Sequence, residues 1–156
     1  MSRTALRLDE LGIVLPVPVA PVANYVGFTR LGRMLIVSGQ LPIGSDGKIA
    51  PAFVGKLGPE SAIERAREAA RLCAINVLAQ VRAAIGDLDS VAQVARLGGF
   101  FNVAGHFEHL PQAMNGASDL MAEVFGERGR HARTTVGVAH LPLNAMAEVE
   151  ALFEVA

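Results

Sequence analysis

The stretch AEVEALFEV, residues 147–155, alternates between apolar and mostly acidic positions along its whole length. Because successive side chains of a β-strand point to opposite faces of a sheet, this alternation predicts a strand with two unlike faces. We expect helices to cover the apolar face, which consists of Ala147, Val149, Ala151, Phe153 and Val155.

The opposite face of this strand carries Glu148, Glu150 and Glu154, with Leu152 among them. If water covers that face, the three carboxylates are simply solvated. If subunits bury it, each carboxylate needs a cation or several hydrogen-bond donors. The arginines that lead into the neighbouring strand could supply those cations.

These arginines lie in GERGRHARTTVGV, residues 126–138, where Arg128, Arg130, His131 and Arg133 precede an apolar, β-branched run. We expect a loop over 126–133 and a strand over 134–141. The charge in the loop has two interpretations, a solvated loop or an anion-binding site. A phosphate or RNA contact is the weaker form of the second, because no aromatic side chains interleave to stack on bases and the net charge is −1.

Helical patterns occupy three other parts of the chain. Apolar residues recur at three- and four-residue steps over 59–86, which predicts a long amphipathic helix with Pro59 in its first turn and Gly86 after its end. A second helix is expected over 111–126, and a short one over 4–11. Three prolines between residues 16 and 21 indicate an extended lead-in rather than a central strand.

Two further strands are expected, over 33–43 and 91–104. The first is apolar on both faces at residues 34–37, so it requires cover on both sides. In the second, Gly98 and Gly99 indicate a bulge or a close backbone approach. Strands and helices in this order predict a single α+β domain over residues 1–156, with helices on one face of the sheet.

The composition restricts the class of protein. Hydrophobic residues make up 51% of the 156 residues but aromatic residues only 5%, which favours burial of some apolar surface between subunits. One cysteine, Cys73, excludes an internal disulfide, and its place on the apolar side of the long helix indicates inert core. The first residues lack the pattern of a signal peptide and no apolar run is long enough to span a membrane, so we expect a cytoplasmic protein.

Two motifs resemble those of a known family. HARTTVGVAHLPLNAMAEVEA, residues 131–151, resembles the C-terminal signature of the reactive-intermediate deaminase family, also called Rid or YjgF. NYVGFTRLGRMLIVSGQLP, residues 24–42, is similar to the N-terminal part of that family, in which a Tyr precedes Ser-Gly-Gln. NGASDLMAEVFGERGRHAR, residues 115–133, resembles a branch described as endoribonuclease L-PSP or chorismate-mutase-like. Residues 1–20 look like an extension found in that branch.

The resemblance implies a chorismate-mutase-like fold with a mixed sheet, two long helices on one face, and three chains joined as a homotrimeric barrel. Ligand clefts would lie between subunits and need neither metal nor cofactor. Arg133 matches the arginine that binds the substrate carboxylate, and Glu148 matches the glutamate that positions water. The other cleft positions implied by the resemblance are Tyr25, Ser38, Gly39, Asn115 and Thr135.

The sequence departs from the family pattern at two of the positions around Arg133. His131 stands where many members have Pro, and Thr135 where many have Cys. Both changes concern the identity of the substrate more than the fold.

The chemistry of the two principal residues agrees with these roles. The guanidinium of Arg133 can hold a carboxylate through two charge-assisted hydrogen bonds, and Glu148 could act as general base toward water. A 2-imino acid bound there would be hydrolysed to a 2-keto acid and ammonia. The structural alternative is an ion pair of Arg133 with Glu148 or Glu150. Ser38 has no accompanying Asp–His arrangement, so a serine hydrolase is improbable.

Three functions therefore remain open at the level of the sequence. The first is hydrolysis of small carboxylated imines or enamines, and the second is a homotrimer that binds a small carboxylated metabolite without turning it over. The third is endoribonuclease activity, which only the family label implies. His106 and His109 lack the spacing of a zinc site, so loop histidines without a metal are the favoured interpretation.

Overall fold

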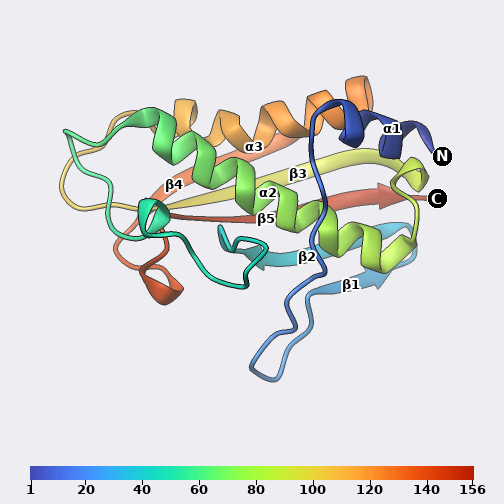
Figure 1. Ribbon diagram of the computed structural model, residues 1–156, viewed down its shortest axis with the longest axis horizontal. Coiled ribbons are helices and arrows are strands. Elements are labelled where there is room, and N and C mark those ends of the chain that lie inside the picture. Colours follow the sequence, from blue (N-terminus) through green and yellow to red (C-terminus); the bar gives the residue numbers. More distant parts are fainter.

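The computed structural model describes residues 1–156 and is built on one five-stranded sheet. The strands are β1 (Phe28–Leu31), β2 (Met34–Gln40), β3 (Val91–Asn102), β4 (Ala132–Val138) and β5 (Ala147–Val155), and their order is β1-β2-β5-β3-β4. All neighbours are antiparallel except β3 and β4, which run parallel. The sheet is therefore mixed, and β1 and β4 form its two edges (Figure 1).

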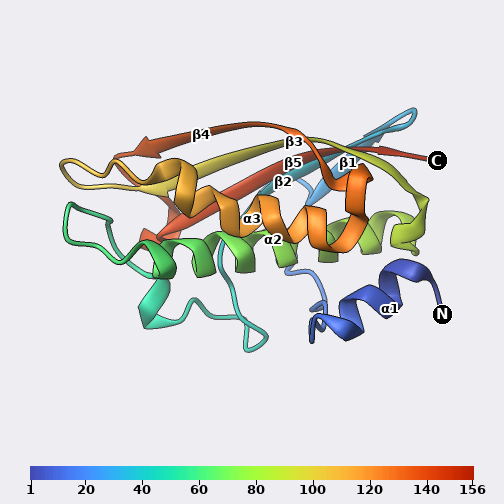
Figure 2. The ribbon, with the colours of Figure 1, turned by 90° about the horizontal axis from the view of Figure 1, so that it is seen from above.

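Two long helices, α2 (Ile63–Ile85) and α3 (Leu110–Phe125), lie side by side on one face of this sheet (Figure 2). Their buried sides meet the alternate residues of β5 that the sequence assigned to the covered face, and all five of those residues are buried. The α+β class and the placement of both helices on one face are thus confirmed. No helix is long and apolar enough to cross a membrane.

The start of α2 differs from the prediction. The helix begins at Ile63, because Gly58 to Ser61 close a turn of their own. Ser61 donates its backbone N–H to the Gly58 carbonyl at 3.0 Å, and its hydroxyl accepts from the Gly58 N–H at 2.8 Å. Pro59 therefore occupies the second position of a turn, where its fixed φ fits equally well.

Strand β1 was not predicted as a strand, although its chain partner β2 was. It forms a hairpin with β2 through Gly32, which has φ 60°, and it pairs Phe28 with Val37. Three of its four residues are exposed, so its sequence carries no alternation between buried and solvated positions. An exposed edge strand of this length leaves little periodic signal.

The N-terminal extension is part of the folded domain. Helix α1 (Arg3–Glu10) begins at the N-cap Ser2, and the Asp89 carboxylate accepts the backbone N–H groups of Arg3 and Thr4, each at 2.9 Å. Desolvation acts to raise the pKa of Asp89, but these hydrogen bonds and the nearby Arg3 charge together outweigh it and hold the pKa below its usual value. The chain then crosses α2 as an extended segment before it enters β1 (Figure 1).

Candidate functional site

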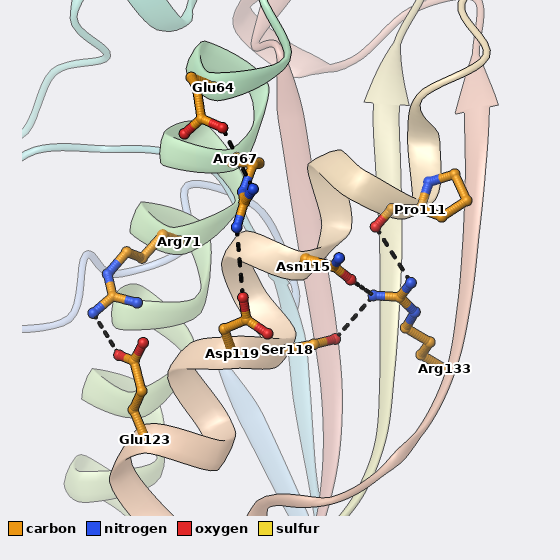
Figure 3. A network of polar contacts seen from close by, with 9 residues as sticks. All are labelled: Glu64, Arg67, Arg71, Pro111, Asn115, Ser118, Asp119, Glu123 and Arg133. Carbon is orange, nitrogen blue, oxygen red and sulfur yellow. Dashed lines mark hydrogen bonds and ion pairs between the residues drawn. The ribbon is translucent and has the colours of Figure 1, made fainter.

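Arg133 lies on the edge strand β4, on the same face of the sheet as the helices. It stands opposite Leu97 of β3, which is buried beneath them. The prediction placed Arg133 in a loop, and that was wrong: β4 already begins at Ala132. A strand fixes the direction of the side chain, which turns toward α3 (Figure 3).

Neutral acceptors hold the guanidinium of Arg133 in place. Its Nη1 donates to Asn115 Oδ1 at 2.8 Å and to Ser118 Oγ at 3.2 Å, and its Nη2 donates to the Pro111 carbonyl at 3.3 Å (Figure 3). None of the eight ion pairs of the chain includes Arg133. Of the five N–H donors of a guanidinium, the Nε–H and one Nη2–H have no protein partner. Within one chain, the expected alternative of an ion pair with Glu148 or Glu150 does not occur.

Helix α3 presents these acceptors because it packs tightly on α2. A side chain at Gly116 would place its Cβ 2.0 Å from the Arg67 carbonyl oxygen, so only glycine permits this approach. Two ion pairs lie across the same helix contact, Arg67–Asp119 at 3.6 Å and Arg71–Glu123 at 2.8 Å (Figure 3). The orientation of Asn115 and Ser118 toward Arg133 follows from this close contact.

His131 extends the Arg133 network. Its Nδ1 lies 2.6 Å from the Gly129 carbonyl, which can only accept, so Nδ1 carries the proton. In the neutral imidazole Nε2 then accepts from the Ser118 hydroxyl at 2.9 Å, while Ser118 Oγ accepts from Arg133. Ser118 was absent from the predicted site. Its position three residues after Asn115, on the same side of a helix, is the one signal that pointed to it.

Glu148 lies on the other face of the sheet, which no helix of the chain covers. It stands opposite Phe100 of β3, its side chain is half-buried, and no hydrogen bond or ion pair reaches its carboxylate. Burial, and secondarily the neighbouring Glu150 carboxylate, raise the pKa of Glu148 above its usual value. The result is a carboxylate of increased basicity without a cation.

Gly39 makes room for this carboxylate. A Cβ at Gly39 would lie 2.1 Å from Glu148 Oε1, so the predicted pair Gly39 and Glu148 are in contact. Ser38 precedes them, but its hydroxyl donates to the Val26 carbonyl at 2.7 Å and its backbone N–H to the Gly27 carbonyl at 2.9 Å. Ser38 thus fastens the segment before β1 to β2.

The two remaining predicted residues, Thr135 and Tyr25, lie in different parts of the chain. Thr135 lies two residues after Arg133 on the helix face, and its hydroxyl donates to the Gly99 carbonyl at 3.5 Å. Tyr25 lies on the segment that leads into β1 and is 58% exposed. The chain therefore brings Arg133, Asn115 and Thr135 together at one edge, and Glu148 and Gly39 together on the open face.

Within one chain these two groups do not converge. Leu97 pairs with both Arg133 and Ala151, and all three share the helix face, whereas Gly98 pairs with Glu150 and Phe100 with Glu148 on the open face. The expected bulge or close backbone approach at Gly98 and Gly99 does not occur. The Glu150 side chain lies against the first and the Met114 side chain against the second, and the register shifts of β3 lie earlier, before Leu97. A site that used both Arg133 and Glu148 would need a second copy of the chain.

The other arginines of residues 126–133 have structural or solvated roles. Arg128 donates to the Val91 carbonyl at 2.5 Å and lies 6.0 Å from the centre of the Phe125 ring. Arg130 is exposed and its only charged partner is Glu127, at 3.7 Å. Within one chain these residues do not pair with the glutamates of β5, because Arg96 pairs with Glu150 at 3.3 Å and Arg33 with Glu154 at 3.1 Å.

Cys73 and His106 lie outside this site. Cys73 is fully buried in α2, and burial, more than the nearby Glu148, raises the pKa of its thiol well above the usual value, which agrees with inert core. His106 pairs with Glu108 at 2.8 Å on an exposed loop. No group of three or more His, Cys, Asp or Glu side chains has an arrangement that could hold a metal ion.

Comparison with known proteins places the whole chain in one family. Residues 5–155 match the family model described as "YjgF/chorismate_mutase-like, putative endoribonuclease". Protein TCP17 of Trypanosoma cruzi is 46% identical over 154 residues, which cover 98% of this chain and 94% of that protein.

Two solved structures give the same result. Atu1372 from Agrobacterium tumefaciens, a protein with unknown function, is 48% identical with a TM-score of 0.90, covering 99% of this chain and 93% of that one. A protein from Shewanella oneidensis MR-1, described as a "putative endoribonuclease", is 36% identical with a TM-score of 0.92, covering 97% of this chain and 99% of that one. The chain therefore belongs to the YjgF/chorismate mutase-like family.

Proposed function

We propose that this protein hydrolyses small 2-imino or enamine acids in a cleft between two copies of the chain. The observation that carries the proposal is Arg133, an exposed guanidinium that neutral groups hold in a fixed position without a carboxylate partner. A fixed, unpaired guanidinium with two donors to spare suits a carboxylated ligand, because a carboxylate accepts two parallel hydrogen bonds from such an edge.

Glu148 supplies the second function in the proposed cleft. A carboxylate with a raised pKa and no cation is a general base for water. With the ligand carboxylate on Arg133, water held by Glu148 adds to the imine carbon and forms the C–O bond, while its proton passes to Glu148. Proton transfer to nitrogen then allows the C–N bond to break, which releases ammonia and leaves the 2-keto acid.

The need for a second copy follows from the opposite orientation of the two residues. Strand and sheet geometry place Arg133 and Glu148 on different faces of one sheet, so a neighbouring chain must bring its Glu148 face to the Arg133 edge. The open face also carries partly exposed apolar side chains, among them Ile36, Phe100 and Leu152. We propose that three chains bury this face against one another, as the resemblance to the family implies.

The test is the replacement of Arg133. The purified protein should accelerate 2-keto acid formation from 2-iminopropionate generated in the assay, and Arg133→Ala should lower kcat/KM by about 10²-fold or more, the loss expected for a charge-assisted pair with the substrate. Arg130→Ala, which removes an exposed arginine three residues earlier, is the matched control and should leave the rate unchanged. Equal rates for Arg133→Ala and the wild type would refute the assignment.

Endoribonuclease activity is the second candidate, because the family description contains it. Among the arginines near the site, Arg128 is bound to backbone carbonyls, which leaves Arg130 and Arg133 for an RNA strand. The same preparations should therefore be incubated with single-stranded RNA. Cleavage that co-purifies with the protein and disappears in Arg133→Ala would favour this candidate over imine hydrolysis.

A further inference from the structure

The extended segment of residues 12–19 crosses α2 (Figure 1). A cavity of about 380 Å³ lies between this segment and the loop of residues 43–47. Helix α2 forms the floor through Asn76 and Ala79. A second hollow of about 270 Å³ adjoins the first on the other side of Pro16 and shares Asn76 with it. Neither hollow is lined by Arg133 or Glu148.

The chemistry of the wall defines what the cavity can hold. No charged side chain lines it, and its apolar part comes from Pro16 to Val19, Ile43 and Ala79. The Gln40 carboxamide is held within the chain, because it donates to the Ser38 carbonyl at 3.0 Å and accepts from Gln80 at 3.5 Å. A ligand with a net charge would lose its hydration there without gaining an opposite charge.

Asn76 and Ser45 are the other polar side chains of the wall. Asn76 is more than nine-tenths buried, and its Nδ2 donates to the Leu41 and Ile43 carbonyls, each at 2.9 Å, but its Oδ1 accepts no hydrogen bond. The Ser45 hydroxyl also makes none within the chain. No side-chain oxygen of the chain is both enclosed and unpaired, so Asn76 Oδ1 is accessible, and in the wall of the cavity it can accept a hydrogen bond from a ligand donor.

The segment over the cavity is able to adjust to a ligand. Arg82 donates to the Leu15 carbonyl at 2.9 Å, but the backbone of residues 17–22 takes part in no hydrogen bond within the chain. Val17 is 87% exposed and Val19 is 55% exposed. Packing alone holds this part of the segment, so its displacement breaks no backbone hydrogen bond.

We propose that this cavity binds a compact, uncharged and largely apolar molecule that donates a hydrogen bond to Asn76 Oδ1. It is a second site, distinct in position and in ligand class from the anion-binding site proposed at Arg133. The segment of residues 12–19 covers the ligand, Asn76 orients it, and Ser45 provides a further polar contact.

Indole and 1-methylindole are suitable probes, because they share one ring system and only indole has an N–H donor. The full chain, labelled with ¹⁵N, is titrated with each while the Asn76 side-chain amide and the backbone amides of 43–47 are followed by NMR. Indole should shift these signals saturably with a dissociation constant of about 1 mM or lower. 1-Methylindole should bind about fivefold more weakly, as expected for the loss of one neutral hydrogen bond.

A pair of variants locates the site without altering Asn76. Val19→Trp fills the cavity and should abolish the indole shifts, whereas Val22→Trp adds the same side chain to a fully exposed position that does not line the cavity and should leave them unchanged. Unsaturable shifts scattered over the surface, equal affinity for both probes, or undiminished binding in Val19→Trp would each overturn the proposal.

Discussion

Arg133 and Glu148 belong to the same sheet but differ in how the fold treats their charge. Arg133 is exposed and yet fixed, because Asn115, Ser118 and the Pro111 carbonyl all accept from it. Glu148 is half-buried and yet has no partner, and its pKa is raised. The first arrangement holds a cation ready for an anion, and the second keeps a carboxylate basic. Arg133 therefore lacks an anionic partner and Glu148 lacks a cationic one, so neither residue forms a complete site by itself.

Removal of the Glu148 carboxylate should have the largest effect on this comparison. If Glu148 acts as general base, Glu148→Gln should lower kcat for imine hydrolysis by about 10²–10³-fold while KM changes little. Glu154→Gln is the control, since Glu154 lies on the same face but pairs with Arg33 at 3.1 Å. A rise in KM at constant kcat would instead assign substrate binding to Glu148.

Assemblies that contain both variants then show whether Arg133 and Glu148 of one site come from different chains. Arg133→Ala and Glu148→Gln chains are co-expressed with different affinity tags and purified through both tags. In a ring of three chains built from both variants one site in three retains both residues, so about one third of the wild-type rate should return. If both residues of a site came from one chain, the mixture would stay inactive.

An alanine at Gly39 should produce an intermediate effect. Its Cβ would lie 2.1 Å from Glu148 Oε1, so the carboxylate must move away, and we expect a fall in kcat of about tenfold with a native circular dichroism spectrum. Gly98→Ala is the matched control, because its Cβ would meet Glu150 at 2.8 Å and leave Glu148 in place. Equal losses in both variants would indicate a general disturbance of the open face.

The smallest effect concerns stability. Because the folded state raises the pKa of Glu148, ionised Glu148 costs stability above the folded pKa, and this cost disappears as the pH falls through the folded pKa toward the unfolded value. Glu148→Gln should therefore have a higher Tm than the wild type at about pH 8, and the difference should shrink toward about pH 4.5. A constant difference across this range would show that the carboxylate charge is not its cause.

Much of the fold could be predicted from periodic patterns. The alternation in residues 147–155 identified both faces of β5, and the helical spacing of apolar residues identified α2 and α3. Prediction failed where the periodic signal was weak. The exposed strand β1 was missed, and Pro59 was placed in α2 because the turn that Ser61 closes with Gly58 has the same preference for proline.

The candidate site was predictable only in part. Arg133, Asn115 and Glu148 were singled out because their surroundings resemble family motifs, and the structure does place the first two in contact. Ser118 and the Pro111 carbonyl had no sequence signal of comparable strength, because hydrogen bonding to Arg133 depends on how closely α3 approaches β4. That approach depends in turn on Gly116 against the Arg67 carbonyl, a contact between helices far apart in the chain.

The sequence by itself determined the elements, the two unlike faces of β5 and the family, since these follow from local periodicity and from contiguous motifs. Only the tertiary structure decided that Arg133 and Glu148 face opposite sides of the sheet, because strand register sets which residues share a face. Tertiary packing also decided the partners of each charge. Neutral groups hold Arg133 in place. Glu150 forms an ion pair with Arg96, and Glu154 forms one with Arg33. Glu148 has no cationic partner, because no basic side chain of its own chain reaches it.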